Sequence, residues 1–153
     1  PEQPSQPITL TVDVYKFDEA LHTSPKKEYV EYTLTNGGYR YKFGFYYAFK
    51  SGDLIRLTDG TTLGYVKFPA IDGYKLTNIT LTSGAGSNKR IKLWSDDPLT
   101  AAKELDAYEL LGTSTTTAEQ SFDIKDPQVG VAYYISSQAT NAQFRNLVLT
   151  YEK

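Results

Sequence analysis

Apolar and polar residues alternate through most of this chain, and a period of two is typical of β-strands. The pattern is clearest over residues 39–49, where every second residue is aromatic. We therefore predict one strand with six rings on a single face: Tyr39, Tyr41, Phe43, Phe45, Tyr47 and Phe49. Such a face is either part of a core or a flat platform for a ligand. The rule that a long apolar face is usually buried favours the core.

About ten short runs of this kind are separated by turn signals, as in an all-β sandwich or barrel. The predicted strands are 8–17, 29–34, 39–49, 53–57, 62–68, 76–82, 89–94, 120–124, 131–136 and 144–151. Two of the turns, at 36–38 and 59–60, contain Asn-Gly or Asp-Gly, which tolerate positive φ. The order of elements shows no βαβ alternation, so we do not expect a parallel sheet.

One segment departs from the strand pattern. Asp97 precedes Pro98, and an aspartate followed by proline can begin a helix as its N-cap. We predict one short helix or helical turn near 98–106. The chain has 153 residues, enough for one core, so we expect a single β-sandwich domain over 8–153. Residues 1–7 are rich in Pro, Gln and Ser and are predicted to form an N-terminal spacer.

Composition narrows the classes of function. The net charge is −2, which does not favour a nucleic-acid partner, and no apolar run approaches the roughly 20 residues of a membrane span. The absence of Cys excludes disulfides, thiolate catalysis and Cys-ligated zinc. We predict no cofactor and no metal. Tyr outnumbers Phe by 13 to 7, and tyrosine suits half-exposed sheets and binding surfaces.

Two places carry candidate binding residues. On the reverse side of the aromatic strand, Arg40, Lys42 and Tyr46 share a face, which is either half of a polar ligand site or an ordinary solvated surface. In the strand 89–94, Trp94 shares a face with Lys92 and is followed by Asp96–Asp97. A tryptophan beside charges can stack on a sugar ring while the charges bind its hydroxyls. The alternative is that the loop or helical turn after Pro98 covers and buries Trp94.

Catalytic motifs are not evident. His22 is the sole histidine and lies in a predicted polar loop, and no Gly-x-Ser-x-Gly motif occurs. The glycine-rich segment 83–88 lies between strands and lacks the phosphate-binding spacing, so we interpret it as a hairpin connection. A pair of carboxylates for glycoside hydrolysis has no recognisable motif but stays open as an alternative.

A resemblance adds to this interpretation. Residues 64–80 contain Gly73-Tyr-Lys-Leu-Thr-Asn-Ile-Thr80 after a strand that ends in Pro69, and residues 132–135 and 141–152 form a closing pair of strands. Through these segments the stretch from Gly64 to Tyr151, a little over half of the chain, resembles secreted jelly-roll domains of Bacteroidetes similar to galactose-binding-like and carbohydrate-binding modules. Such domains often belong to surface or periplasmic lipoproteins. The resemblance implies a jelly-roll fold, a secreted, periplasmic or outer-membrane-surface location and a lipid anchor upstream of Pro1. It supplies no set of ligand residues.

We therefore predict an all-β, two-sheet antiparallel sandwich of the jelly-roll type. The hypothesis for function is non-catalytic binding of a polysaccharide or glycan by a module of a bacterial cell-envelope protein. Its stacking residues would be Trp94, Tyr46 and Tyr134, and its hydroxyl-binding residues would be Arg40, Lys92 and Asp96. One alternative is a structural or adhesive module, which predicts a buried Trp94 and no groove. The other is a hydrolase, which requires two carboxylates about 5–10 Å apart.

Overall fold

The computed structural model describes residues 7–12, 17, 21–52, 54–57, 63–83, 89–100, 107–110, 119–137 and 142–153, which form twelve strands. Six of them belong to what we call the first sheet: β1 (Ile8–Val12), β4 (Ala48–Ser51), β5 (Leu54–Leu57), β7 (Lys75–Ser83), β10 (Glu119–Asp123) and β12 (Ala142–Glu152). The other six form the second sheet: β2 (Tyr29–Asn36), β3 (Tyr39–Tyr46), β6 (Tyr65–Lys67), β8 (Lys89–Trp94), β9 (Ala107–Leu110) and β11 (Tyr134–Ser137).

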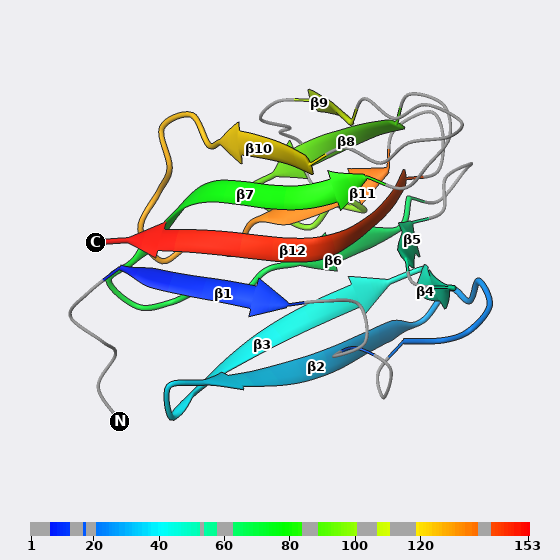
Figure 1. Cartoon of the computed structure of the whole chain (residues 1–153), viewed down its shortest axis with the longest axis horizontal. Helices are drawn as coiled ribbons and strands as arrows, with labels where there is room; N and C mark the ends of the chain where they lie inside the picture. The colour runs from blue at the N-terminus through cyan, green and yellow to red at the C-terminus, as the bar shows by residue number, and fades with distance from the viewer. Residues whose placement is uncertain are drawn as a thin grey trace.

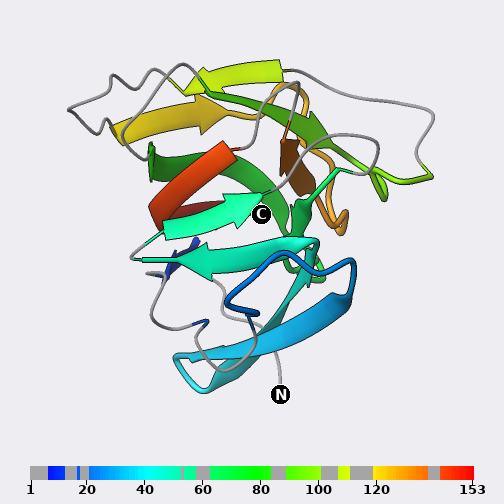
Figure 2. The same ribbon diagram turned by 90° about the vertical axis from the view of Figure 1, so that its right-hand side faces the viewer.

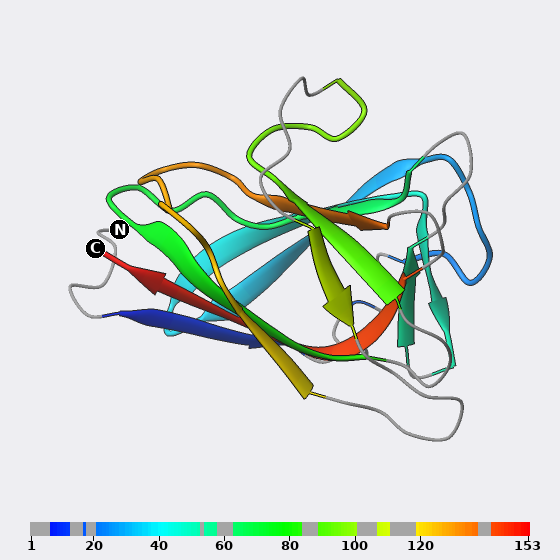
Figure 3. The same cartoon turned by 90° about the horizontal axis from the view of Figure 1, so that it is seen from above.

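The two sheets lie as two layers, which are clearest when the molecule is seen from above (Figures 1 and 3). The first sheet has the order β10-β7-β12-β5-β4, with β1 also paired to β12. The second sheet has the order β2-β3-β6-β11-β8-β9. Every strand pair in both sheets is antiparallel. The predicted all-β, two-sheet antiparallel sandwich is confirmed.

The alternation of apolar and polar residues explains which face of each strand points into the core. In β1, Ile8, Leu10 and Val12 are buried, whereas the two threonines between them are exposed. In β12 the phase changes at Asn146, which has a φ of 55° at a shift in the pairing with β7. Such a bulge adds one residue to the strand. The buried positions accordingly move from Phe144 to Leu147, and both apolar side chains stay in the core.

The hairpin between β2 and β3 fixes their register. Gly37 and Gly38 have φ values of 62° and 83°, and positive φ at both central residues is the requirement of a type I′ turn. Asn36 then pairs with Tyr39, and the pairing continues to Tyr29 and Tyr46 at the far end. The turn predicted at 36–38 is confirmed.

The aromatic stripe is part of the core, but it does not lie on one strand. Tyr41, Phe43 and Phe45 are 2%, 0% and 0% exposed. The prediction of a single strand to Phe49 is wrong. Tyr47 has a φ of 52°, and there the chain leaves β3 of the second sheet and enters β4 of the first. Figure 2 faces the side of the molecule on which β4 and β5 lie.

The inner faces of the two sheets meet around aromatic side chains. The ring of Phe17 packs on Phe43 and Phe45, with ring centroids 5.6 and 4.8 Å apart. Tyr151 of β12 donates a hydrogen bond of 2.7 Å from its hydroxyl to the carbonyl oxygen of Pro69, which follows β6. This bond joins the first sheet to the end of a strand of the second.

In the segment predicted as a short helix or helical turn near 98–106, residues 97–100 form a turn closed by a 3.0 Å bond from the Thr100 N–H to the Asp97 carbonyl oxygen. The rest of the expected helix, 101–106, and residues 1–6 of the expected spacer lie outside the described residues. The strand β9 was not predicted. Within the described ranges, no helix is long and apolar enough to cross a membrane.

The position of the stripe can be tested by comparing the two faces of β3. We expect Phe43→Ala to lower the free energy of unfolding by about 3–5 kcal/mol, because it leaves a cavity between the sheets. Arg40→Ala changes an exposed side chain on the opposite face and should alter it by less than about 0.5 kcal/mol. Urea denaturation followed by circular dichroism measures both. Similar losses from the two variants would contradict this placement of the rings.

Candidate functional site

The outward-facing side chains of the second sheet form two rows that cross its strands. The pairings of β2, β3, β6, β11 and β8 align Glu31, Gly44, Lys67, Tyr134 and Trp94 in one row. The neighbouring row contains Tyr29, Tyr46, Tyr65, Ser136 and Lys92. Directly paired side chains on one face lie close enough to interact. The register therefore gathers aromatic and charged residues from five strands.

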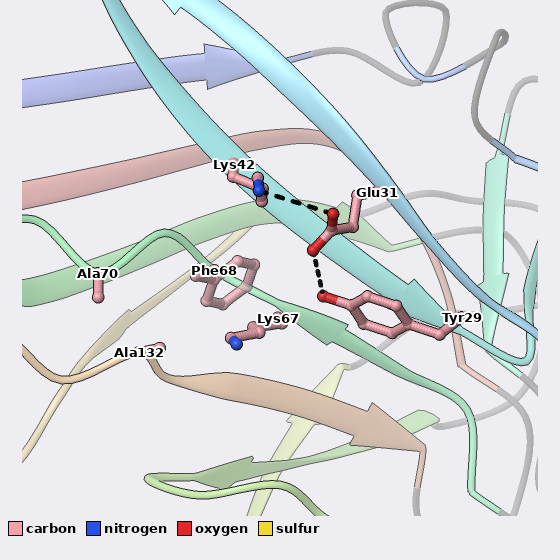
Figure 4. A pocket seen from close by; sticks show the side chains of 7 residues that line it. All are labelled: Tyr29, Glu31, Lys42, Lys67, Phe68, Ala70 and Ala132. Carbon is pink, nitrogen blue, oxygen red and sulfur yellow. Dashed lines mark hydrogen bonds and ion pairs between the residues drawn. The ribbon is translucent and has the colours of Figure 1, made fainter.

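A pocket of about 190 Å³ lies at the end of these rows over β2, β3 and β6 (Figure 4). Its lining consists of Tyr29, Glu31, Lys42, Lys67, Phe68, Ala70 and Ala132. We call it the outer-face pocket. Gly44 has no side chain to fill the space between its row neighbours Glu31 and Lys67.

The ring of Tyr29 lies over Gly44. A Cβ atom added at Gly44 would overlap the Tyr29 hydroxyl and would lie 2.7 Å from Cζ. The glycine therefore permits a ring position that no other residue would allow. Tyr29 nevertheless keeps 42% of its surface exposed, so the ring is both held in place and accessible.

Glu31 connects the Tyr29 hydroxyl and the Lys42 ammonium group on one side of the pocket. The Tyr29 hydroxyl donates a 3.1 Å hydrogen bond to Oε2 of Glu31, and Nζ of Lys42 lies 3.7 Å from Oε1 (Figure 4). Partial burial, the hydrogen bond to Glu31 and the charge of Glu31 raise the pKa of Tyr29 to about 12. Tyr29 is therefore a neutral donor at physiological pH.

Lys67 lies apart from this chain of contacts. Its Nζ is 5.8 Å from the ring centroid of Tyr134, within the range of a cation–π contact. In the part of the chain that the structure describes, no carboxylate lies within 4.0 Å of this ammonium group. The pocket thus contains one paired lysine and one lysine whose contact is an aromatic ring.

An aromatic cluster adjoins the pocket along the same face. Tyr65, Trp94 and Tyr134 are buried together, and Tyr46 and Leu63 pack against them. Tyr46 stacks on Tyr65 with centroids 5.5 Å apart, and Tyr65 meets Tyr134 edge-on at 5.3 Å. Burial, followed by the charge of Asp97, raises the pKa of both Tyr65 and Tyr134. The loop after β8 therefore brings a carboxylate toward this cluster.

Trp94 is a buried member of that cluster and not a freely exposed ring. It is 8% exposed, its Nε1 donates a 2.8 Å hydrogen bond to Oγ of Ser136, and Nζ of Lys92 lies 5.5 Å from its ring centroid. Pro98, in the turn that follows, is also buried. Of the two alternatives predicted for Trp94, the structure agrees with the one in which the side chain is buried.

The other predicted site residues are only partly brought together. Tyr46, Tyr134 and Lys92 lie on the same face as Trp94, in the two rows described above. Asp96 is exposed in the adjacent loop, where its Oδ1 accepts a 2.8 Å bond from the N–H of Asp97. Arg40 pairs with Thr35 at the other end of β3, about 20 Å from Tyr46 at roughly 3.3 Å per residue. Arg40 therefore cannot contact a sugar that stacks at Tyr46.

Of the residues that line the outer-face pocket, only Lys42 was singled out from the sequence; the functional residues that were missed are Tyr29, Glu31 and Lys67. Tyr29 and Glu31 are two residues apart in a predicted strand, so their common face could have been inferred. Their approach to Lys67 depends on the pairing of three strands across Gly44, which the sequence pattern does not reveal.

The sole histidine, a carboxylate pair and a metal site were also considered from the sequence, and among the described residues none of them contributes to the outer-face pocket. His22 lies 3.4 Å from Glu28 and does not line the outer-face pocket. Glu31 is the one carboxylate among the described residues of the pocket lining. Over the described ranges, no group of three or more His, Cys, Asp or Glu side chains is arranged to hold a metal ion.

No family model and no curated protein matches this sequence. Solved structures do match the fold. A family 6 carbohydrate-binding module studied by binding sub-site dissection has a TM-score of 0.50 and 15% identity, over 92% of each chain. The module CsCBM6-3 from Clostridium stercorarium, in complex with cellobiose, has a TM-score of 0.50 and 12% identity, also over 92% of each chain. The protein therefore has the jelly-roll sandwich fold of carbohydrate-binding modules, and at these identities the likeness concerns the fold alone.

The buried hydrogen bond of Trp94 gives a first prediction for this face. Ser136→Ala leaves the indole N–H without its acceptor and should lower the free energy of unfolding by about 1–3 kcal/mol. Ser24→Ala, at an exposed serine in the loop before β2, should change it by less than about 0.5 kcal/mol. Trp94 is the only tryptophan, so the unfolding curve and the emission maximum can both be read from its fluorescence. Unchanged stability of the Ser136 variant would contradict the importance of this bond.

The raised pKa of Tyr29 predicts a dependence on alkaline pH. Because the folded-state pKa lies near 12 and the ordinary pKa of tyrosine is 10.0, this group stabilises the fold fully below pH 10. The contribution is lost as the pH rises from 10 toward 12. Carbon NMR of labelled tyrosine should show a late titration that disappears in Tyr29→Phe. In Glu31→Gln the same titration should move to lower pH, and a Tyr29 pKa that does not move would contradict the role given to Glu31.

Proposed function

We propose that this protein is a non-catalytic glycan-binding module and that the outer-face pocket receives a sugar ring. The observation that carries the proposal is the ring of Tyr29, held over Gly44 yet 42% exposed, beside a pocket lined by Glu31, Lys42 and Lys67. The jelly-roll fold is compatible with this function but does not by itself argue for it.

The chemistry of the pocket suits a sugar. A pyranose has an apolar face of C–H groups, which can stack on the Tyr29 ring, and a rim of hydroxyls. The carboxylate of Glu31 accepts hydrogen bonds from hydroxyls, and the ammonium groups of Lys42 and Lys67 donate them. With about 190 Å³, the pocket is smaller than most drug-sized ligand sites, so it would hold one unit of a longer glycan.

We assign the residues predicted from the sequence different roles within the same face. Tyr134 and Trp94 would act as supports that hold the ammonium groups of Lys67 and Lys92 above their rings. Tyr46 is partly buried at the edge of the aromatic cluster and would contact the next sugar unit. Asp96 would bind hydroxyls from the loop after β8.

A structural or adhesive module is the second candidate. The burial of Trp94 favours it, because that function needs no exposed tryptophan. The outer-face pocket argues the other way, since a purely structural face needs no hollow beside an exposed ring.

Binding should be measured with a glycan array, followed by calorimetry on the polysaccharides that bind. Tyr29→Ala should weaken the affinity about tenfold, the effect of losing one stacked ring of about 1.4 kcal/mol. Val129→Ala removes an exposed apolar side chain outside the pocket lining and should leave the affinity unchanged. If no glycan binds, or if Tyr29→Ala binds as the parent does, this function or this site is wrong.

Gly44→Ala offers a test that removes no polar group. Its Cβ would push the Tyr29 ring aside, and stability should fall little because the obstacle is the outer end of a half-exposed side chain. We expect weaker glycan binding in Gly44→Ala but no further loss when it is added to Tyr29→Ala, because the two changes act through one ring. Additive losses in the double variant would contradict this mechanism.

We further propose, from the resemblance of residues 64–80, 132–135 and 141–152, that the module belongs to a lipoprotein of the bacterial cell envelope. A precursor that carries a signal peptide with cysteine at the cleavage site would support this location. A precursor with no export signal would contradict it.

A further inference from the structure

The charges of the outer-face pocket do not balance. Glu31 is engaged by the Tyr29 hydroxyl at 3.1 Å and by Lys42 at 3.7 Å, so its carboxylate already has a cation and a donor. Lys67 contributes a second positive charge to the lining, and its contact is the ring of Tyr134 at 5.8 Å. The lining therefore has one positive charge in excess.

The surroundings of Lys67 leave room for an anion. Its neighbours across the sheet are Gly44, which has no side chain, and Tyr134. Ala70 and Ala132, which also line the pocket, have small side chains without charge. The carboxylates of Asp96 and Asp97, in the loop after β8, act on Tyr134, and that of Asp97 acts also on Tyr29, but neither lines the pocket.

A half-buried ammonium group gains more from an anion than from a hydroxyl. Both an anion and a hydroxyl can accept a hydrogen bond from the ammonium, but only the anion adds the Coulomb attraction between two opposite unit charges. The ring of Tyr134 keeps the ammonium in position without neutralising it. Lys42 lies on the other side of the pocket from Lys67. Its ammonium group is paired with Glu31 but still carries a positive charge.

We propose that the outer-face pocket selects an acidic sugar, whose carboxylate or sulfate group pairs with the ammonium of Lys67. This inference rests on the proposed function and names the class of glycan that the same site takes. Lys67 is then the residue that distinguishes acidic from neutral glycans, whereas Tyr29 contributes to the binding of both.

The test uses pairs of probes that differ in charge. Oligogalacturonate and its methyl ester examine the carboxylate, and sulfated dextran and dextran of the same length examine the sulfate. For at least one pair, calorimetry at low salt should show the acidic member binding about tenfold more tightly. The preference should decrease as salt is raised, because a partly exposed ion pair is screened.

Three variants identify the residue responsible. Lys67→Gln should abolish the preference, because the acidic member loses an ion pair whereas the neutral member loses only a hydroxyl contact, and Lys67→Arg should retain most of it. Lys153→Gln is the matched control, since Nζ of Lys153 also lies over a tyrosine ring, 5.5 Å from that of Tyr74, but does not line the pocket. It should keep the full preference.

The outcomes separate this inference from the proposed function. If neutral glycans bind as well as acidic ones, or if Lys67→Gln weakens both equally, Lys67 is an ordinary hydroxyl donor and the inference is wrong, while the glycan-binding function stands. The same holds if the array finds neutral ligands and neither acidic probe binds. If no glycan of any charge binds, both the function and the inference fail.

Discussion

The burial of the β3 rings between the two sheets is the constraint on which the outer face depends. Phe43 and Phe45 are fully buried, and side chains alternate along a strand, so Lys42, Gly44 and Tyr46 must face outward. A shift of one residue in the pairing would place a lysine in the core and phenylalanines in solvent. The same packing that stabilises the sandwich therefore sets which residues a ligand can meet, and the type I′ turn at Gly37–Gly38 holds β2 in the matching register.

On the outer face, lysines cover one side of the buried rings. Lys67 lies over Tyr134 and Lys92 over Trp94, and both rings are only 8% exposed. A ligand that approaches these rings meets an ammonium group before it meets an aromatic surface. Tyr29 is different, because its ring lies over a glycine and not under a lysine. Under the proposed function, recognition on this face would combine one accessible ring with several charged groups, and charge should contribute more to selectivity than stacking does.

Periodicity predicted the strands and their inner faces because burial acts on every second residue. It placed Trp94 and Lys92 on a common face for the same reason. It missed the break at Tyr47, because a positive φ in a tyrosine is imposed by the passage between sheets and not by the residue itself. It also left the exposure of Trp94 open, because that depends on the loop around Pro98. Periodicity could not predict the outer-face pocket, because the pocket arises where three strands pair across Gly44.

The contact between Tyr29 and Gly44 also has a structural interpretation, because an aromatic ring laid over a glycine of a neighbouring strand shields exposed backbone and stabilises a sheet. The two roles do not compete. A ring that already covers Gly44, and whose hydroxyl is hydrogen-bonded to Glu31, has lost much of its conformational freedom during folding. Less freedom then remains to be lost when a ligand stacks on it, which favours affinity. The interaction that makes this tyrosine useful to the fold is thus also the one that would prepare it for the proposed binding.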